Sequence, residues 1–187
     1  MKLSLLASVA LAASVFAGAA SAQTQPTSPG PVVPGVCLYN HDRLLAQSAV
    51  GAAVSARLQQ LAEAVRAEMA PEGAAIQAEA TALQSIPAEQ RIDRTNALAQ
   101  RLQNFQALEQ QRGMELAYTQ QTQEQAIAAS VEPLLAGVYV ERGCGVLFQA
   151  GAVHYANPQM DVTDRVIELL NSQLQTLSFD RMALPQQ

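Results

Sequence analysis

The chain has 187 residues but only one lysine, no tryptophan and few aromatic residues. Lys2 is that single lysine, and aromatic side chains make up 4% of the sequence. Nucleic-acid binding normally needs a basic surface and aromatic rings for base stacking, so this composition argues against it. The absence of lysine after position 2 also excludes lysine chemistry, both in a phosphate-binding loop and in a Schiff base.

Histidine is almost as scarce, since His41 and His154 are the only two. Neither has a cysteine or carboxylate at a recognisable metal-ligand spacing, so no metal site is expected. The GxSxG and HExxH motifs of hydrolases do not occur. Carboxylate pairs such as Glu63 and Glu68 are typical of a solvated helix face. The sequence therefore predicts neither an enzyme nor a cofactor.

The first residues have the pattern of a secretory signal peptide. Lys2 precedes an apolar run over residues 3–17, and small residues follow up to Ala22. We expect cleavage between Ala22 and Gln23. A membrane anchor is the alternative, but about 15 apolar residues fall short of the roughly 20 that a spanning helix needs. No later run has 18 uninterrupted apolar residues, so we expect an exported chain without stable membrane insertion.

The only two cysteines are Cys37 and Cys144. In an oxidising exported compartment, such a pair is more often bridged than free. Closing a loop of about 100 residues would contribute roughly 4 to 5 kcal/mol to stability in the chain-entropy description. Two buried thiols are the alternative, whereas a redox-active pair is disfavoured because there is no CxxC motif. We expect a disulfide that ties the start of the fold to its end.

Helical periodicity dominates the middle of the chain. After the proline-rich segment 23–35, interpreted as a disordered arm, residues 36–39 form a short apolar run that predicts a strand. Apolar residues then recur at spacings of four and three, which predicts a long amphipathic helix. These residues are Val50, Val54, Leu58, Leu61, Val65 and Met69. Pro71 and Gly73 interrupt the stripe and predict a kink with local flexibility.

A second long helix is predicted after a turn at residues 85–91, which would be the tip of a helical hairpin. Its apolar stripe runs from Ile92 to Val138, but it is thin and rich in glutamine between Phe105 and Ile127. Such a surface must pair with the first helix or with other subunits. Apolar residues near the tip have few neighbours to cover them, so they are candidate contacts for a bound protein. These candidates are Leu83, Ile86, Ile92 and Leu98.

The end of the chain predicts a compact piece. Residues 146–148 and 153–155 are expected to form two strands joined through a short loop with Gly151, and Asp161 or Thr163 is expected to cap a final helix. The prediction is an α+β fold. A small β body, from residues 36–50 and 134–171, carries a long antiparallel helical hairpin, from residues 51–133, and residues 172–187 are a C-terminal tail.

Two segments resemble the Skp/OmpH family of periplasmic chaperones. "RGCGVLFQAGAVHYANPQMDVTDRVIELLN" resembles the C-terminal pattern of that family, and "VCLYNHDRLLAQSAVGAAVSARL" is similar to its first strand and following helix. The hairpin is similar in length and amphipathicity. The resemblance implies that residues 36–171 are a chaperone domain. It also implies a homotrimer whose three limbs enclose unfolded outer-membrane proteins in the periplasm, without ATP or any cofactor.

The charge of the limb differs from the strongly basic limbs often found in this family. Residues 57–130 contain six arginines and nine acidic residues. Electrostatic capture of acidic clients or lipid head groups is therefore not expected, and binding would depend on apolar side chains. An envelope coiled-coil spacer or adaptor, with the proline-rich arm reaching a partner, is the alternative function. Suppression of aggregation of an unfolded client would separate the two.

Overall fold

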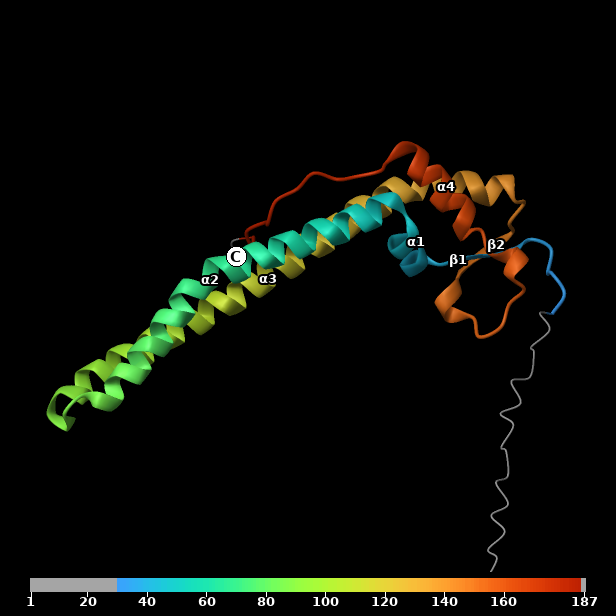
Figure 1. Ribbon diagram of the computed structural model, residues 1–187. Helices are drawn as coiled ribbons and strands as arrows, with labels where there is room; N and C mark the ends of the chain where they lie inside the picture. Colours follow the sequence, from blue (N-terminus) through green and yellow to red (C-terminus); the bar gives the residue numbers. More distant parts are fainter. Residues whose placement is uncertain (1–29, 186–187) are drawn as a thin grey trace, which may run out of the picture.

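The computed structural model describes residues 30–185. The predicted signal peptide 1–22 and most of the proline-rich arm lie outside the described residues. A small body carries two long helices that project from it side by side (Figure 1). The elements are β1 Val36–Tyr39, α1 His41–Gln47, α2 Ala49–Ala82, η1 Leu83–Ser85, α3 Ala88–Glu141, β2 Val146–Gln149, η2 Ala150–Ala152, η3 Pro158–Met160 and α4 Thr163–Gln173, where η denotes a short 3-10 turn.

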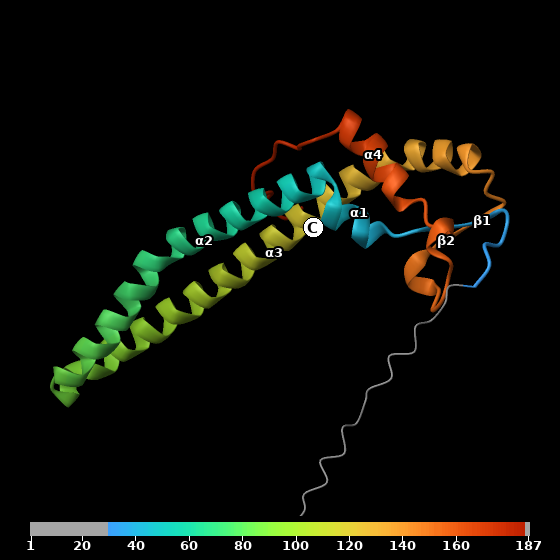
Figure 2. The ribbon, with the colours of Figure 1, turned by 45° about the vertical axis from the view of Figure 1, so that its right-hand side comes forward.

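Helices α2 and α3 form the limb, which agrees with the predicted hairpin (Figure 2). Both helices continue through their internal prolines, Pro71 in α2 and Pro133 in α3, so neither proline ends a helix. The turn at the tip lies between Ala82 and Ala88, with Pro87 immediately before α3. Helix α3 has 54 residues and α2 has 34, and the longer helix α3 also extends into the body.

Helix α2 begins at a tight corner with α1. Ser48 is buried, and its Oγ accepts the N–H of Gly51 at 3.1 Å, which satisfies one free amide of the first turn. A Cβ atom at Gly51 would collide with the backbone carbonyl of Leu45. The corner therefore requires glycine at position 51 because of the close approach between the two helices.

Replacing Gly51→Ala should lower the free energy of unfolding by about 1 to 3 kcal/mol, because the added methyl group forces the two helices apart. Gly137→Ala is the matched control. It also lies inside a helix, but a Cβ there meets nothing within 4 Å, so this change should be neutral or stabilising by up to about 1 kcal/mol. Denaturant unfolding of both variants checks the prediction, and equal effects would contradict it.

The sheet has two parallel strands, which corrects part of the prediction. β1 pairs with β2 from Val36 opposite Val146 to Tyr39 opposite Gln149, and Leu38 also forms one isolated bridge with Asp161. The two strands are parallel because the whole limb lies between them and returns the chain to the same end of the sheet.

The predicted hairpin with residues 153–155 is wrong. After β2 the chain turns through η2, where the Val153 N–H donates to the Ala150 carbonyl at 3.1 Å, and no strand follows as far as residue 185. Asp161 instead lies at the other edge of β1, where the Val162 N–H donates to the Leu38 carbonyl at 2.9 Å, so the edge of β2 that the hairpin strand would use stays unpaired within residues 30–185. A Gly-containing loop predicts a turn, but it does not show whether the segment after the turn pairs with the strand before it.

The body is held together by α4, α1 and the end of α3. Its fully buried apolar side chains include Leu44, Val50, Val138, Val166 and Leu170. The N-cap of α4 is Val162, which makes no side-chain capping bond, so the predicted cap at Asp161 or Thr163 is corrected, although both side chains bond near the start of the helix. The Asp161 carboxylate accepts the Thr163 N–H at 2.8 Å, and the Thr163 hydroxyl accepts the Asn40 N–H at 2.9 Å. The second bond ties the start of α4 to the end of β1.

A disulfide joins Cys37 in β1 to Cys144, just before β2. Their Cα atoms lie 5.7 Å apart, within the range that a bridge requires, and both side chains are buried. The two cysteines are 107 positions apart in the sequence, so the bridge encloses the entire limb.

Both ends of the described chain make more contacts with the rest of the molecule than the sequence predicts. Within the described part of the proline-rich arm, the Gly35 carbonyl accepts N–H groups from Gly145 at 2.6 Å and Val146 at 2.9 Å. The Gly30 carbonyl accepts the Asn157 side-chain amide at 2.7 Å. Residues 30–35 are thus attached to the body rather than part of a disordered arm. At the other end, residues 174–185 follow the limb back from α4 (Figure 1).

Candidate functional site

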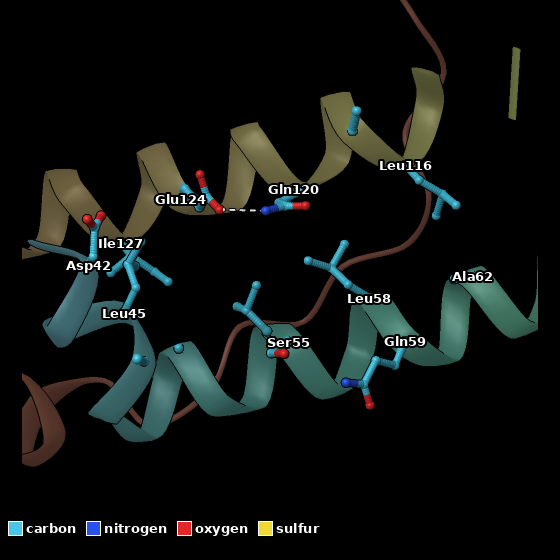
Figure 3. A pocket seen from close by; sticks show the side chains of 14 residues that line it. Asp42, Leu45, Ser55, Leu58, Gln59, Ala62, Leu116, Gln120, Glu124 and Ile127 are labelled. Carbon is cyan, nitrogen blue, oxygen red and sulfur yellow. Dashed lines mark hydrogen bonds between the residues drawn. The ribbon is translucent and has the colours of Figure 1, made fainter. Parts of the chain in front are cut away.

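A hollow of about 680 Å³ opens between α1, α2 and α3 near the root of the limb (Figure 3). Leu58 from α2 and Leu116 from α3 point into it, with Leu45 and Ile127 at its end nearest the body. Polar groups lie at its rim, where the Gln120 side-chain amide donates to the Glu124 carboxylate at 2.8 Å. The lining is largely aliphatic, so the hollow suits apolar side chains.

A second hollow of about 460 Å³ continues along the same side of the limb and shares Ala62 and Leu116 with the first. Small residues make room for it. Gly73 leaves space for the ring of Phe105, which a Cβ atom would approach to 3.4 Å. We call the two hollows together the limb groove. Its apolar lining residues are Leu45, Val54, Leu58, Val65, Met69, Phe105, Leu116 and Ile127.

The limb groove carries no arrangement of nucleophile, base and orienting group. Within residues 30–185, no three His, Cys, Asp or Glu side chains gather where they could hold a metal ion. Over the same range, no helix combines the length and apolar character needed to cross a membrane. What the groove can do chemically is take apolar side chains out of water, at about 25 cal/mol for each Å² buried.

The residues predicted for client contact at the tip differ in accessibility. Ile92 is 66% exposed and lines a small hollow with Thr95, whereas Ile86 and Leu98 are partly covered. Leu83 is 8% exposed because it sits in η1, where the ends of both limb helices pack around it. Leu83 therefore packs within the tip and offers little surface to a client in this structure.

Sequence reasoning missed the limb groove because it treated Leu58, Val65 and Met69 only as the apolar stripe of one helix and placed the candidate client contacts at the tip. The available signal was the set of small residues at the same levels of the limb. Ala62, Ala70, Gly73 and Gly113 all line the groove, and such residues cannot fill the space between two helices. Facing small residues within an apolar stripe therefore indicate a hollow.

Ion pairs connect the two limb helices where the apolar stripe is thin. The Arg101 guanidinium donates to Glu72 at 2.7 Å, and Arg112 donates to Glu68 at 2.8 Å. The hydrogen bond from Arg101 lowers the pKa of Glu72. Hydrogen bonds from Arg112, and then from Arg181, lower the pKa of Glu68. Both carboxylates are therefore charged at neutral pH, and the acidic limb partly neutralises itself internally.

The body has an apolar surface of its own beside β2. Phe148 and Val146 are each 46% exposed, and Tyr155 is more exposed still. Phe148 and Tyr155 line a hollow of about 720 Å³ together with Val153 and with residues of the arm. Within residues 30–185, β2 pairs with β1 only, so its other edge offers free backbone groups. This surface is a candidate contact between subunits.

A long two-helix limb with an apolar groove, on a small disulfide-linked body, defines a class of protein suited to holding other polypeptides. The family described as "Outer membrane protein (OmpH-like)" matches residues 35–170, and the chain belongs to this family. No curated protein matches it. A crystal structure from Caulobacter crescentus CB15, assigned as an OmpH-like outer membrane chaperone, is 34% identical with a TM-score of 0.73. The similarity covers 86% of this chain and 97% of that one. These comparisons support a general chaperone role.

Proposed function

We propose that the protein is an ATP-independent holdase of the periplasm that binds unfolded outer-membrane proteins in the limb groove and prevents their aggregation. The observation that carries this proposal is the continuous apolar groove along a limb that projects from the body. Membership of the OmpH-like family and the chaperone assignment of the Caulobacter protein support it. OmpH-like chaperones are in general periplasmic, which agrees with the predicted signal peptide.

The two hollows of the limb groove have room for only a few client side chains. Full burial of one leucine or phenylalanine contributes about 1.5 to 3 kcal/mol, so one limb alone would hold an unfolded chain weakly. We further propose a trimer, assembled through the apolar surface beside β2. Three limbs that act on one client raise the effective concentration of each groove and convert weak contacts into useful binding.

The experiment is suppression of aggregation when a urea-unfolded outer-membrane β-barrel protein is diluted into buffer without ATP. Leu58→Glu places a charge in the middle of the limb groove. It should raise the amount of protein needed for half-suppression roughly tenfold, equivalent to about 1.4 kcal/mol. Leu102→Glu is the matched control, because Leu102 is an exposed leucine of the same limb that does not line the groove.

The outcomes separate the alternatives. No suppression by the unchanged protein at a few-fold molar excess would reject the holdase and favour an envelope spacer. Suppression that both variants weaken equally would reject the limb groove as the binding surface. Circular dichroism should show the same helical content in both variants, since Leu58 is partly exposed and lies within a helix of 34 residues.

A further inference from the structure

The C-terminal tail, residues 174–185, is bound to the limb in an extended conformation. It runs from α4 along α2 and α3 in both views (Figures 1 and 2), and no residue of the tail lines the limb groove. Side chains alternate along it: Leu177 and Phe179 are partly buried, whereas Ser178 and Asp180 are exposed. This period of two is that of an extended chain with one face on a surface. The family match ends at residue 170, before the tail begins.

Five polar contacts hold residues 179–182 on the limb. Arg57 of α2 donates to the Phe179 carbonyl at 3.1 Å and to the Asp180 carboxylate at 2.7 Å. Arg181 lies between the two helices, 3.0 Å from the Glu68 carboxylate of α2 and 3.1 Å from the Glu115 carboxylate of α3. The Met182 N–H donates to the Thr119 hydroxyl at 2.9 Å.

The limb side of these contacts is built to receive a cation. Apart from the tail, Arg112 is the one cation bonded to Glu68 and Glu115 within the described residues, and Glu115 also accepts the Gln111 side-chain amide at 2.9 Å, so two carboxylates face one guanidinium. The Glu115 side chain is only 5% exposed, and an uncompensated carboxylate at such a position is strongly unfavourable. Arg181 supplies the second positive charge and makes the four groups neutral together.

Thr119 adds recognition of the backbone. Its side chain is fully buried, and its hydroxyl donates to the Glu115 carbonyl at 2.7 Å, which leaves its oxygen free to accept. The N–H that it accepts belongs to Met182, the residue that follows the arginine. The site therefore binds an arginine side chain and the backbone N–H of the following residue. Any extended polypeptide that contains an arginine can present these two groups.

We propose that Glu68, Glu115 and Thr119 form a second binding site, for an extended polypeptide segment that carries an arginine. Residues 177–182 are its intramolecular occupant, and an unfolded client segment displaces them. The displacement rests on the proposed holdase function, whereas the site itself does not. Two of the three ion pairs of the tail, Arg57 with Asp180 and Arg181 with Glu68, involve solvent-exposed carboxylates and contribute little each. The tail stays bound because its covalent attachment gives it a high effective concentration at the site. A client held on the same limb has a similarly high effective concentration and can therefore displace the tail.

The first test uses the chain from Gln23 to its C-terminus and a fluorescent peptide with the sequence of residues 174–185. Arg181→Glu places a third carboxylate in the site and should release the tail, so the peptide should bind this variant at least about tenfold more tightly than the unchanged protein. Gln175→Glu with Ser178→Asp is the control, because it adds the same charge at two exposed positions of the tail. Replacing arginine by glutamine in the peptide should weaken binding about tenfold.

Release of the tail is measured separately by fluorine NMR. The chain has no tryptophan, so Phe179→Trp with fluorotryptophan gives one signal, whose shift reports whether the tail is bound. A tail that stays bound in the Arg181→Glu variant would overturn the site. So would a released tail combined with no peptide binding, or equal binding of the two peptides.

The same signal tests displacement in the protein with Arg181 intact. Adding the unfolded outer-membrane protein should move at least half of the fluorine signal to the released position. If aggregation is suppressed while the signal stays at the bound position, displacement is overturned and the holdase function stands. If aggregation is not suppressed but the peptide binds as expected, the holdase function fails and the arginine site stands.

Discussion

Replacing both cysteines, Cys37→Ser with Cys144→Ser, is expected to lower the free energy of unfolding of the body by roughly 4 to 5 kcal/mol. The bridge links residues that are 107 positions apart, and without it the unfolded chain regains the freedom of a loop that contains the whole limb. Both positions are buried, so serine hydroxyls there without partners would add to the loss. Denaturant unfolding of the oxidised protein and the double variant measures the difference.

The limb serves as the internal control for this experiment. Its two helices pack through their own apolar and ionic contacts, so the helical signal should persist below the new midpoint, and the double variant should still assemble. An unchanged midpoint would mean that the bridge does not constrain the unfolded chain. We propose that the bridge forms in the exported protein. Titration of that protein under denaturant should find no free thiol, and two free thiols would contradict the proposal.

Phe148→Asp is expected to convert the proposed trimer into single chains. Phe148 is 46% exposed beside the free edge of β2, where a subunit contact would bury it, and a carboxylate in that contact would be desolvated without a partner. Because three copies carry the change, the effect on assembly is multiplied. Mass measurement in solution should find three chains for the unchanged protein and one for the variant.

Met114→Asp is the control for the assembly experiment, because Met114 is similarly exposed but lies on the limb, away from the body. It should leave the mass unchanged. A monomer over a wide concentration range for the unchanged protein would contradict the trimer and the enclosed cavity. A Phe148→Asp variant that remains trimeric would place the subunit contact on another surface.

Sequence patterns predicted the features of this protein that depend on residues close together in the chain. Apolar spacing gave both limb helices, and the resemblance of residues 36–58 and 142–171 to the OmpH-like family is confirmed. The hairpin after β2 was wrong because alternating residues around a glycine describe a strand's faces but not its partner. β2 instead pairs with β1, which precedes it by the length of the limb.

The arginine site could not be predicted for a related reason. Arg181 and Glu68 are separated by 113 positions, and neither residue stands in a motif that names the other. The alternation over residues 177–181 indicates an extended segment, but the surface that binds it exists only after α2 and α3 have paired. Sites built between two helices and a returning tail depend on tertiary structure, which single-sequence patterns do not contain.

Helix α3 gives the molecule an asymmetric mechanical design. It is continuous from the tip into the body, about 80 Å at 1.5 Å per residue, and Val131 and Val138 near its end are core residues of the body. Six positions after Val138, the disulfide at Cys144 anchors the same chain to β1. α2 instead meets the body through the corner at Gly51. A force applied at the tip is thus transmitted along one stiff helix into the sheet that carries the proposed subunit contact. In the proposed trimer, a load on one limb would therefore reach the other two.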